Sequence, residues 1–221
     1  MSSPFTIIAN PRTDIWRKPP TTDIFNGPLP SFLSARVSFL LPSQLRQYDQ
    51  AGLLLSLRSH QPSSSYSASS SSSSPPKWIK TGVENYNGTP RAATVACDAW
   101  ADWSLAPVTL PPGSNQNGEE EAQGNWVTVA IERDNDELGQ SLWVYQVVPG
   151  ASPATGTGDK EEIKIPLREI CWPFGHEAGQ AEEQTENSKW HVQVQAYACR
   201  PSKNGNEELE ARFRDFEVRW K

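Results

Sequence analysis

The sequence has little of what marks membrane or secreted proteins. None of its apolar runs approaches the roughly 20 residues that a membrane-spanning helix needs. The N-terminus MSSPFTIIANPRTDIW has no basic segment, and its apolar stretch is shorter than the roughly 7 to 15 residues of a signal peptide core. We therefore expect a cytoplasmic protein that does not associate with membranes.

Cysteine and histidine are also scarce, with three of each in 221 residues. Cys97, Cys171 and Cys199 are odd in number and lack the paired spacing of metal ligands, so reduced thiols are expected. The histidines lie far apart in the sequence, and no serine stands in the motif of a hydrolase nucleophile. The sequence predicts no metal site and no cofactor.

Positive charge is the third deficit. The chain has 20 Lys and Arg against 26 Asp and Glu, a net charge of −6, and the basic residues form no cluster. Nucleic acids and anionic membranes are recognised by concentrated Lys and Arg. Neither is expected as a partner.

What the sequence does contain is the alternation of apolar and polar residues that is typical of β-strands. Strands are predicted at residues 5–9, 35–41, 51–58, 78–84, 93–97, 126–133, 142–148, 163–172, 190–199 and 209–220. No stretch keeps the period of a helix. The apolar alternation of residues 209–220 shifts phase between Phe213 and Phe216, which predicts a β-bulge near Arg214 and Asp215. About ten to twelve strands with long connections predict one all-β domain, a jelly-roll sandwich of two antiparallel sheets over residues 1–221.

The segments between the strands are rich in residues that disfavour a packed core. Residues 61–76 are almost all serine, with too little apolar surface to offset an ordering cost of roughly 1 to 2 kcal/mol per residue. This segment is expected to be a disordered loop. Residues 111–124, 150–160 and 177–188 are expected to be mobile loops, and the proline-rich residues 11–30 to be coil.

The central prediction is a hairpin between residues 78 and 97. Ile79 and Val83 alternate toward one side, which we expect to be the core, while Trp78, Lys80 and Glu84 face the other side. The sequence Asn-Gly at positions 87 and 88 is typical of a type I′ turn, which joins two antiparallel strands with two residues at positive φ.

Lys80 and Glu84 are the candidate catalytic residues, because an ammonium and a carboxylate flank Gly82 on the outward side of this strand. The glycine leaves room for a ligand to approach the backbone. The alternative is an ion pair in solvent, which would contribute about 0 to 1 kcal/mol. The two interpretations differ in whether the charges face a ligand or water.

Nine tryptophans suggest that indole faces contribute to binding, because sugars and flat apolar molecules both stack on indoles, with Lys or Arg beside them for orientation. Trp143 and Tyr145 share one side of a strand and are expected to face solvent. The full set of predicted ligand-binding residues is Gln50, Trp78, Lys80, Glu84, Trp103, Arg133, Trp143, Tyr145 and Arg168.

Seven stretches spread over nearly the whole chain carry a family resemblance: TDIWRKPP (13–20), YDQAGLLLSLR (48–58), WIKTGVENYNG (78–88), DWS (102–104), IERD (131–134), PLREICWPF (166–174) and FRDFEVRW (213–220). They resemble a family of unknown function whose fungal members are called regulation-of-enolase-like proteins. The resemblance implies a concanavalin A-like jelly-roll fold. The serine tract interrupts the pattern of the family before residue 78.

The sequence therefore predicts a ligand-binding protein that holds a carbohydrate or another small molecule in an aromatic and charged groove on one sheet. An enzyme that uses the same groove is the alternative, either a cofactor-free isomerase or cyclase or a glycosidase-like hydrolase. For a hydrolase, Glu132 and Asp134 are the same-strand carboxylate pair. The family name adds a third possibility, a regulatory protein partner of a glycolytic enzyme.

Overall fold

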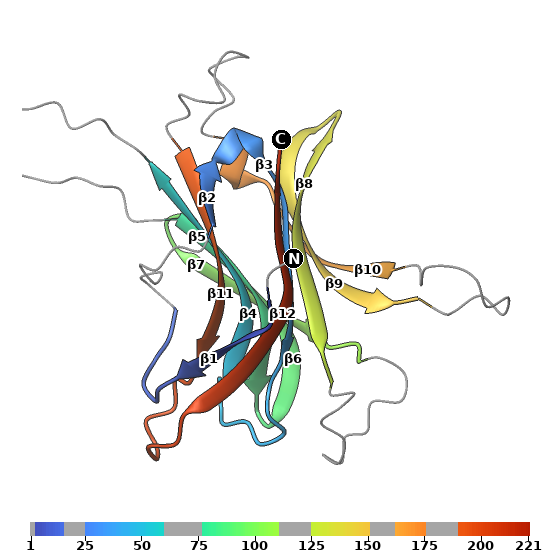
Figure 1. Cartoon of the computed structure of the whole chain (residues 1–221). Helices are drawn as coiled ribbons and strands as arrows, with labels where there is room; N and C mark the ends of the chain where they lie inside the picture. Colours follow the sequence, from blue (N-terminus) through green and yellow to red (C-terminus); the bar gives the residue numbers. More distant parts are fainter. Residues whose placement is uncertain (1–2, 16–24, 60–76, 111–124, 151–161, 176–189) are drawn as a thin grey trace, which may run out of the picture.

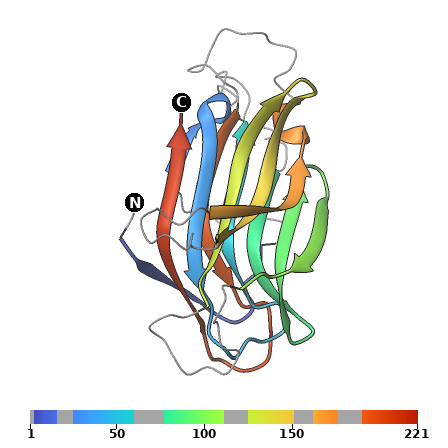
Figure 2. The same cartoon turned by 90° about the vertical axis from the view of Figure 1, so that its right-hand side faces the viewer.

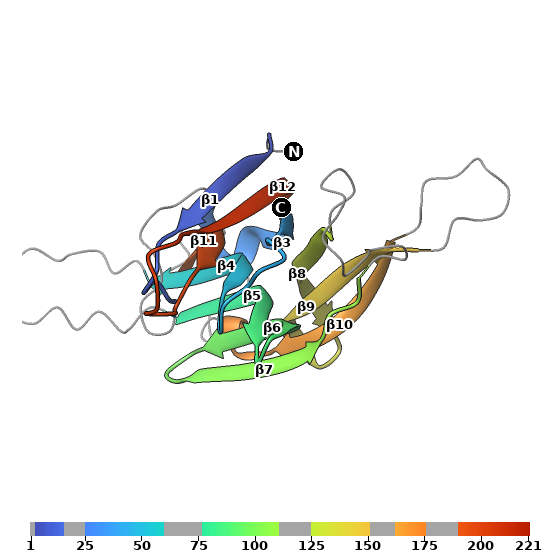
Figure 3. The same ribbon diagram turned by 90° about the horizontal axis from the view of Figure 1, so that it is seen from below.

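A computed structural model describes residues 3–15, 25–59, 77–110, 125–150, 162–175 and 190–221. These residues form two antiparallel six-stranded sheets that pack face to face (Figure 1). The predicted all-β sandwich of two antiparallel sheets is confirmed. Seen from below, the sheets form two layers (Figure 3).

The first sheet, called the β3 sheet, has the strand order β1-β12-β3-β8-β9-β10 and faces the viewer in Figure 2. Its strands are β1 (Phe5–Ala9), β12 (Leu209–Trp220), β3 (Phe32–Leu40), β8 (Val127–Asp136), β9 (Gly139–Pro149) and β10 (Glu162–Ile170).

The second sheet, called the β5 sheet, has the order β2-β11-β4-β5-β6-β7. Its strands are β2 (Phe25–Pro28), β11 (Trp190–Cys199), β4 (Gln50–Ser59), β5 (Lys77–Tyr86), β6 (Thr89–Cys97) and β7 (Ala101–Pro107). Two short 3-10 helices, η1 (Leu29–Ser31) and η2 (Trp172–Phe174), complete the described elements. No helix in the described part of the chain is long and apolar enough to cross a membrane.

The core lies between the sheets and is built from the inward side chains of both. Ile79 and Val83 of β5 belong to it, as the alternation predicted, and they pack with aliphatic and aromatic side chains of β3, β4, β8 and β12. Because inward and outward residues alternate along a strand, placing Ile79 and Val83 inside directs Lys80 and Glu84 to the outer face of the β5 sheet.

Two local predictions about backbone geometry are confirmed. Asn87 and Gly88 have φ of 52° and 74°, so the β5–β6 connection is a two-residue turn with both central residues in the left-handed region. Strand β12 has a register shift between Arg214 and Glu217, and Asp215 has φ of 53°. This irregularity is the β-bulge predicted from the change of phase near residues 214–215.

Two strands were not predicted. Strand β7 lies in a stretch where no strand was predicted, and it closes one edge of the β5 sheet. Its Trp103 and Leu105 do alternate with polar neighbours. Strand β2 lies in the proline-rich segment that was expected to be coil, and it pairs with β11 over only four residues at the opposite edge. Prolines are tolerated there because an edge strand leaves one row of backbone groups unpaired.

The predicted loops fall almost entirely outside the described residues. This applies to residues 61–76, 111–124, 151–160 and 177–188.

Candidate functional site

The outer face of the β5 sheet combines charged, amide and aromatic side chains. The strand register places residues of five neighbouring strands on this face: Gln50, Leu54 and Ser56 of β4; Trp78, Lys80 and Glu84 of β5; Val95 and Cys97 of β6; Trp103 of β7; Gln195, Tyr197 and Cys199 of β11. Lys80 lies between Leu54 and Val95, and Glu84 lies opposite Gln50.

This face is covered rather than open. The segment Pro11–Ile15, called the N-terminal strap, runs beside the end of β11, where Thr13 N donates to Arg200 O at 3.2 Å and Arg12 N donates to Ser202 O at 3.3 Å. Ile15 is buried in a second apolar cluster, outside the sandwich core, with side chains of β4, β5, β6 and β11. The strap therefore shields part of the face from water.

Lys80 is the most buried charge of the face, with 2% of the residue exposed. Its Nζ donates to Gln50 Oε1 at 2.7 Å and lies 3.8 Å from Asp14 Oδ1 of the strap. Burial lowers the pKa of Lys80, although the charges of Asp14 and Glu84 act in the opposite direction. The sequence-based expectation of an exposed Lys80 was wrong, because the strap and the neighbouring strands exclude water from it.

Gln50 orients the lysine. While Gln50 Oε1 accepts from Lys80, Gln50 Nε2 donates to Tyr48 O at 3.2 Å and approaches Asp14 Oδ1 at 3.5 Å. An amide side chain offers both a donor and an acceptor, so it can connect the ammonium to the carboxylate. Gln50 thus links strand β4 to the strap through Lys80 and Asp14.

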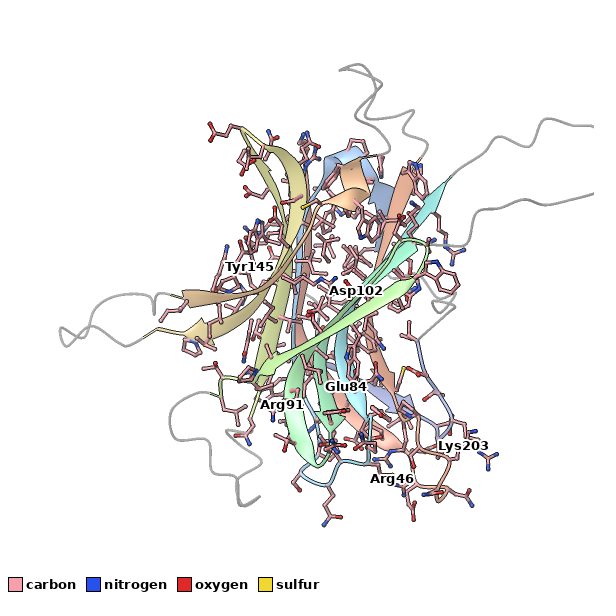
Figure 4. All side chains as sticks on the ribbon, turned by 180° about the vertical axis from the view of Figure 1, so that it is seen from behind. Arg46, Glu84, Arg91, Asp102, Tyr145 and Lys203 are labelled. Carbon is pink, nitrogen blue, oxygen red and sulfur yellow. The ribbon has the colours of Figure 1, made fainter. Side chains whose placement is uncertain are left out.

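Glu84 is also buried, with 6% of the residue exposed, and lies on β5 below Asp102 in Figure 4. Burial raises the pKa of Glu84 to about 6, against the opposing charge of Lys80. Within the described residues, its carboxylate makes no hydrogen bond or ion pair, even though Arg91 is its direct partner on β6. Such a carboxyl group can exchange a proton near neutral pH.

Aromatic rings lie along the face on both sides of the Lys80 and Glu84 positions. Tyr86 and Trp103 contact each other edge to face at 5.5 Å between centroids, and Tyr48 lies 6.2 Å from Tyr86. Trp78 is fully buried, and Lys80 Nζ lies 5.9 Å from its ring. In the described part of the chain, the buried indole nitrogens of Trp78 and Trp103 have no hydrogen-bond partner.

Gly82 has a different role from the predicted one. Gly82 and Gly52 are direct partners on β5 and β4. A Cβ at Gly82 would lie 2.0 Å from Ala51 O, and a Cβ at Gly52 would lie 2.1 Å from Thr81 O. The two strands themselves therefore require glycine here, whereas the sequence suggested space for a ligand.

A buried ion pair holds the end of the face where the strap is attached. Arg200 donates to Asp49 through Nε at 3.0 Å and through Nη2 at 2.7 Å, and both residues are almost fully buried. The backbone NH of Arg46 also donates to Asp49, at 2.8 Å. Since Arg200 O accepts from the strap and Asp49 precedes Gln50, this pair positions both sides of the site.

Four of the predicted site residues lie elsewhere. Trp143 and Tyr145 stack at 6.1 Å on the outer face of the β3 sheet, on the solvent side as predicted but in a different sheet from Glu84 (Figure 4). Arg133 donates to Gln140 Oε1 at 2.6 Å and packs on the ring of Phe174 at 4.5 Å. These contacts hold a strand end and the η2 turn.

Arg168 joins the edges of the two sheets. It donates from β10 to Asp102 O at 3.0 Å and forms an ion pair with the Asp102 carboxylate on β7. Arg133 and Arg168 therefore lie on strands of the β3 sheet, apart from Lys80. Alternation within a strand does not reveal which sheet the strand joins.

The candidate hydrolase pair shows no catalytic arrangement. Glu132 accepts from Lys164 at 2.7 Å, and Asp134 accepts from the backbone of Asn135 at 3.0 Å. Each carboxylate is engaged in a local surface contact. Among the described residues, no group of three or more His, Cys, Asp or Glu could hold a metal ion.

Several residues of the face were not predicted from the sequence. Asp14 comes from a segment expected to be coil, and Tyr197 and Cys199 lie on a strand that was predicted without assigning its outward side to the site. Burial raises the pKa of Cys199 to about 12, so this thiol is an apolar component of the face. The outward alternation of β11 was the signal that could have identified both residues.

Comparison with known proteins establishes the family. Residues 2–147 match the family described as "Protein of unknown function (DUF1349)". The chain belongs to the DUF1349 family. This match includes the strap and the strands that carry Gln50, Lys80, Glu84 and Trp103.

Two proteins similar to this chain are described without a function. An uncharacterized protein from Emericella nidulans is 35% identical over 210 residues, which cover 92% of this chain and 80% of the relative. A functionally unknown protein from Saccharomyces cerevisiae, whose crystal structure is solved, aligns with a TM-score of 0.56 and 17% identity over 99% of this chain and 88% of its own. The yeast structure shows a similar fold and no more.

Proposed function

We propose that this protein binds a small hydroxyl-rich ligand, of which carbohydrates are the principal class, on the outer face of the β5 sheet. The observation that carries the proposal is the burial of Lys80 and Glu84 beside Gln50 on the outside of the sandwich. Burying charges costs free energy unless they are compensated. A sheet that needed only solubility would expose these charges.

The chemistry of the face suits such a ligand. Hydroxyl groups both donate and accept, and the face offers an ammonium, an amide and a carboxyl group for them. The C–H faces of sugar rings pack on aromatic side chains, which Tyr86 and Trp103 provide at the Glu84 end. Polar and apolar recognition are therefore available side by side.

Isothermal titration calorimetry with glucose, galactose, mannose, xylose and their β-linked oligosaccharides tests the proposal. We expect at least one of these compounds to bind, and Lys80→Met and Trp103→Ala to weaken its binding at least tenfold.

Matched controls come from the opposite sheet. Lys164 lies 5.8 Å from the ring of Tyr145, much as Lys80 lies near Trp78, so Lys164→Met removes a comparable lysine. It should leave binding unchanged, as should Trp143→Ala. If instead the β3-sheet variants lose binding and the β5-sheet variants keep it, the site lies on the other sheet.

A second function, acid–base catalysis without a cofactor, is favoured by one observation. Glu84 has a pKa raised to about 6, and burial lowers the pKa of Lys80, so both groups are shifted toward neutral pH. Glu84 as carboxylate could take a proton from a hydroxyl-bearing carbon next to a carbonyl group. The resulting acid could return this proton to the former carbonyl carbon, while the hydroxyl proton moves to the former carbonyl oxygen and the carbonyl group shifts by one carbon. This is the chemistry of an isomerase.

Deuterium exchange separates binding from catalysis. A reducing sugar that binds is incubated with the protein in D₂O, and the C–H next to its carbonyl is followed by proton NMR. An isomerase would exchange this hydrogen with the wild type and not with Glu84→Gln, while both bind the sugar. A wild type that binds without exchange is a binding protein only.

A further inference from the structure

The strap brings a carboxylate to the buried lysine of the face. Asp14 Oδ1 lies 3.8 Å from Lys80 Nζ and 3.5 Å from Gln50 Nε2. Lys80 and Gln50 are buried residues of the sheet, whereas the Asp14 side chain is 41% exposed. Lys80 and Gln50 can both donate hydrogen bonds to an anion, and they therefore lie close to a carboxylate from a separate segment.

The neighbouring residue places an apolar group beside that carboxylate. Ile15 is 5% exposed and packs among Leu54, Trp78, Tyr197 and further side chains of the second apolar cluster. The strap thus places the carboxylate of Asp14 next to the apolar side chain of Ile15. Strands β4, β5 and β11 provide a complementary surface for both.

We propose that Asp14 and Ile15 occupy the place of the ligand, and that the ligand is a small compound with a carboxylate next to a sugar or aromatic ring. This inference rests on the proposed function of the same face. The carboxylate would accept from Lys80 Nζ and Gln50 Nε2, and the ring would pack where Ile15 packs. Uronic acids and aromatic carboxylic acids share this chemistry.

The geometry explains how a ligand would displace the strap. A separation of 3.8 Å is longer than a hydrogen bond, and Asp14 is partly hydrated, so this ion pair is weak. A ligand carboxylate at hydrogen-bond distance from Lys80 would form a charge-assisted bond, which is roughly twice as strong as a neutral one. The ligand carboxylate would also lie closer to the buried ammonium of Lys80 than the carboxylate of Asp14 does.

The test uses pairs of compounds that differ in the acid group: glucuronate with glucose, and benzoate with benzamide. Calorimetry with the full-length protein at constant ionic strength should show at least tenfold tighter binding of the acid member of at least one pair. Preference within the glucuronate pair alone assigns a uronic acid, and preference within the benzoate pair alone assigns an aromatic acid.

Two variants locate the preference. Asp14→Asn removes the competing charge at a partly exposed position where folding is not at risk, and it should strengthen binding of the acid at least threefold without changing binding of the neutral member. Lys80→Met should abolish the preference, and Lys164→Met should preserve it.

Three outcomes would overturn the inference. If both members of each pair bind equally and both are lost in Lys80→Met, the face binds ligands but does not select a carboxylate. If the acid binds more tightly but Asp14→Asn has no effect on it, Asp14 does not stand in for the ligand. If neither the wild type nor Asp14→Asn binds any of these compounds or the neutral sugars, the proposed function falls as well.

Discussion

The outer faces of the two sheets carry similar residues in opposite environments. On the β3 sheet, Lys164 contacts Glu132 at 2.7 Å with side chains 48% and 30% exposed, next to the stacked pair of Trp143 and Tyr145. On the β5 sheet, Lys80 is almost completely buried and contacts Gln50. Asp14 and Ile15 of the strap lie on the second face, next to Lys80 and the second apolar cluster.

The pKa values of one glutamate on each face are shifted in opposite directions. The hydrogen bond from Arg36 lowers the pKa of Glu162 on the β3 sheet, because the charged form is paired while it stays accessible to water. Burial raises the pKa of Glu84 on the β5 sheet. Composition alone does not distinguish a buried glutamate from a solvated one, whereas the directions of these two pKa shifts reflect that difference.

The largest expected difference between the faces concerns their arginine ion pairs. Arg200→Met would leave Asp49 buried without its partner, which should reduce the free energy of unfolding by about 3–5 kcal/mol. Arg36→Met on the other face removes an exposed pair with Glu162 and should cost about 1 kcal/mol or less. Urea unfolding followed by tryptophan fluorescence measures both, and equal losses would contradict the distinction.

The second prediction concerns the reason for glycine at position 82. Gly82→Ala would place a methyl group 2.0 Å from Ala51 O, so β4 and β5 would have to separate, at a cost of about 1–3 kcal/mol or more. Gly88→Ala meets open space in the turn and should cost about 1–2 kcal/mol through its positive φ alone. Thermal unfolding compares the two variants. A Gly82→Ala protein as stable as the wild type would show that the strands can adjust.

The third prediction concerns pH. Glu84 has a pKa of about 6 in the folded protein and an ordinary value of 4.5, so the folded state binds more protons between these two pH values. Stability should therefore fall as pH rises from 4.5 to 6, by at most about 2 kcal/mol from this group. Glu84→Gln should lack this part of the slope in urea unfolding at several pH values. A slope identical to that of the wild type would show that Glu84 ionises normally.

Most of the fold could be predicted because alternation determines which side chains face the core. Ile79 and Val83 are inside, and the turn at Asn87 and Gly88 and the bulge near Asp215 lie where the sequence indicated. Strand β2 was missed because it has only four residues and lies in a proline-rich segment, which an edge position tolerates. Strand β7 was missed because its alternation is limited to Trp103 and Leu105.

The site was predicted only in part, for a physical reason. Lys80, Glu84 and Gln50 follow from alternation and register on adjacent strands. Part of the cover of Lys80 comes from the strap, where Thr13 accepts a hydrogen bond from the backbone of Arg200, 187 positions further along the sequence. The assignment of Trp143 and Tyr145 to the same site failed because strand pairing across the chain, rather than periodicity, decides which sheet a strand joins.

The smallest effect is expected from deleting residues 63–74, which connect the two strands that carry Gln50, Lys80 and Glu84. Leu57 and Lys77 are already paired across β4 and β5, so the ends of this connection are held together by the sheet. Shortening the connection roughly threefold changes its closure free energy by only about 1 kcal/mol, or about 2–4 °C in melting temperature. Because Asp14 and Ile15 of the strap lie on the face that carries Lys80 and Glu84, we expect the deletion to leave the pH slope attributed to Glu84 intact as well. Melting curves at pH 4.5, 5, 6 and 7 record both quantities. A large drop in melting temperature, or loss of the Glu84 slope, would show that the segment contributes to the covered face.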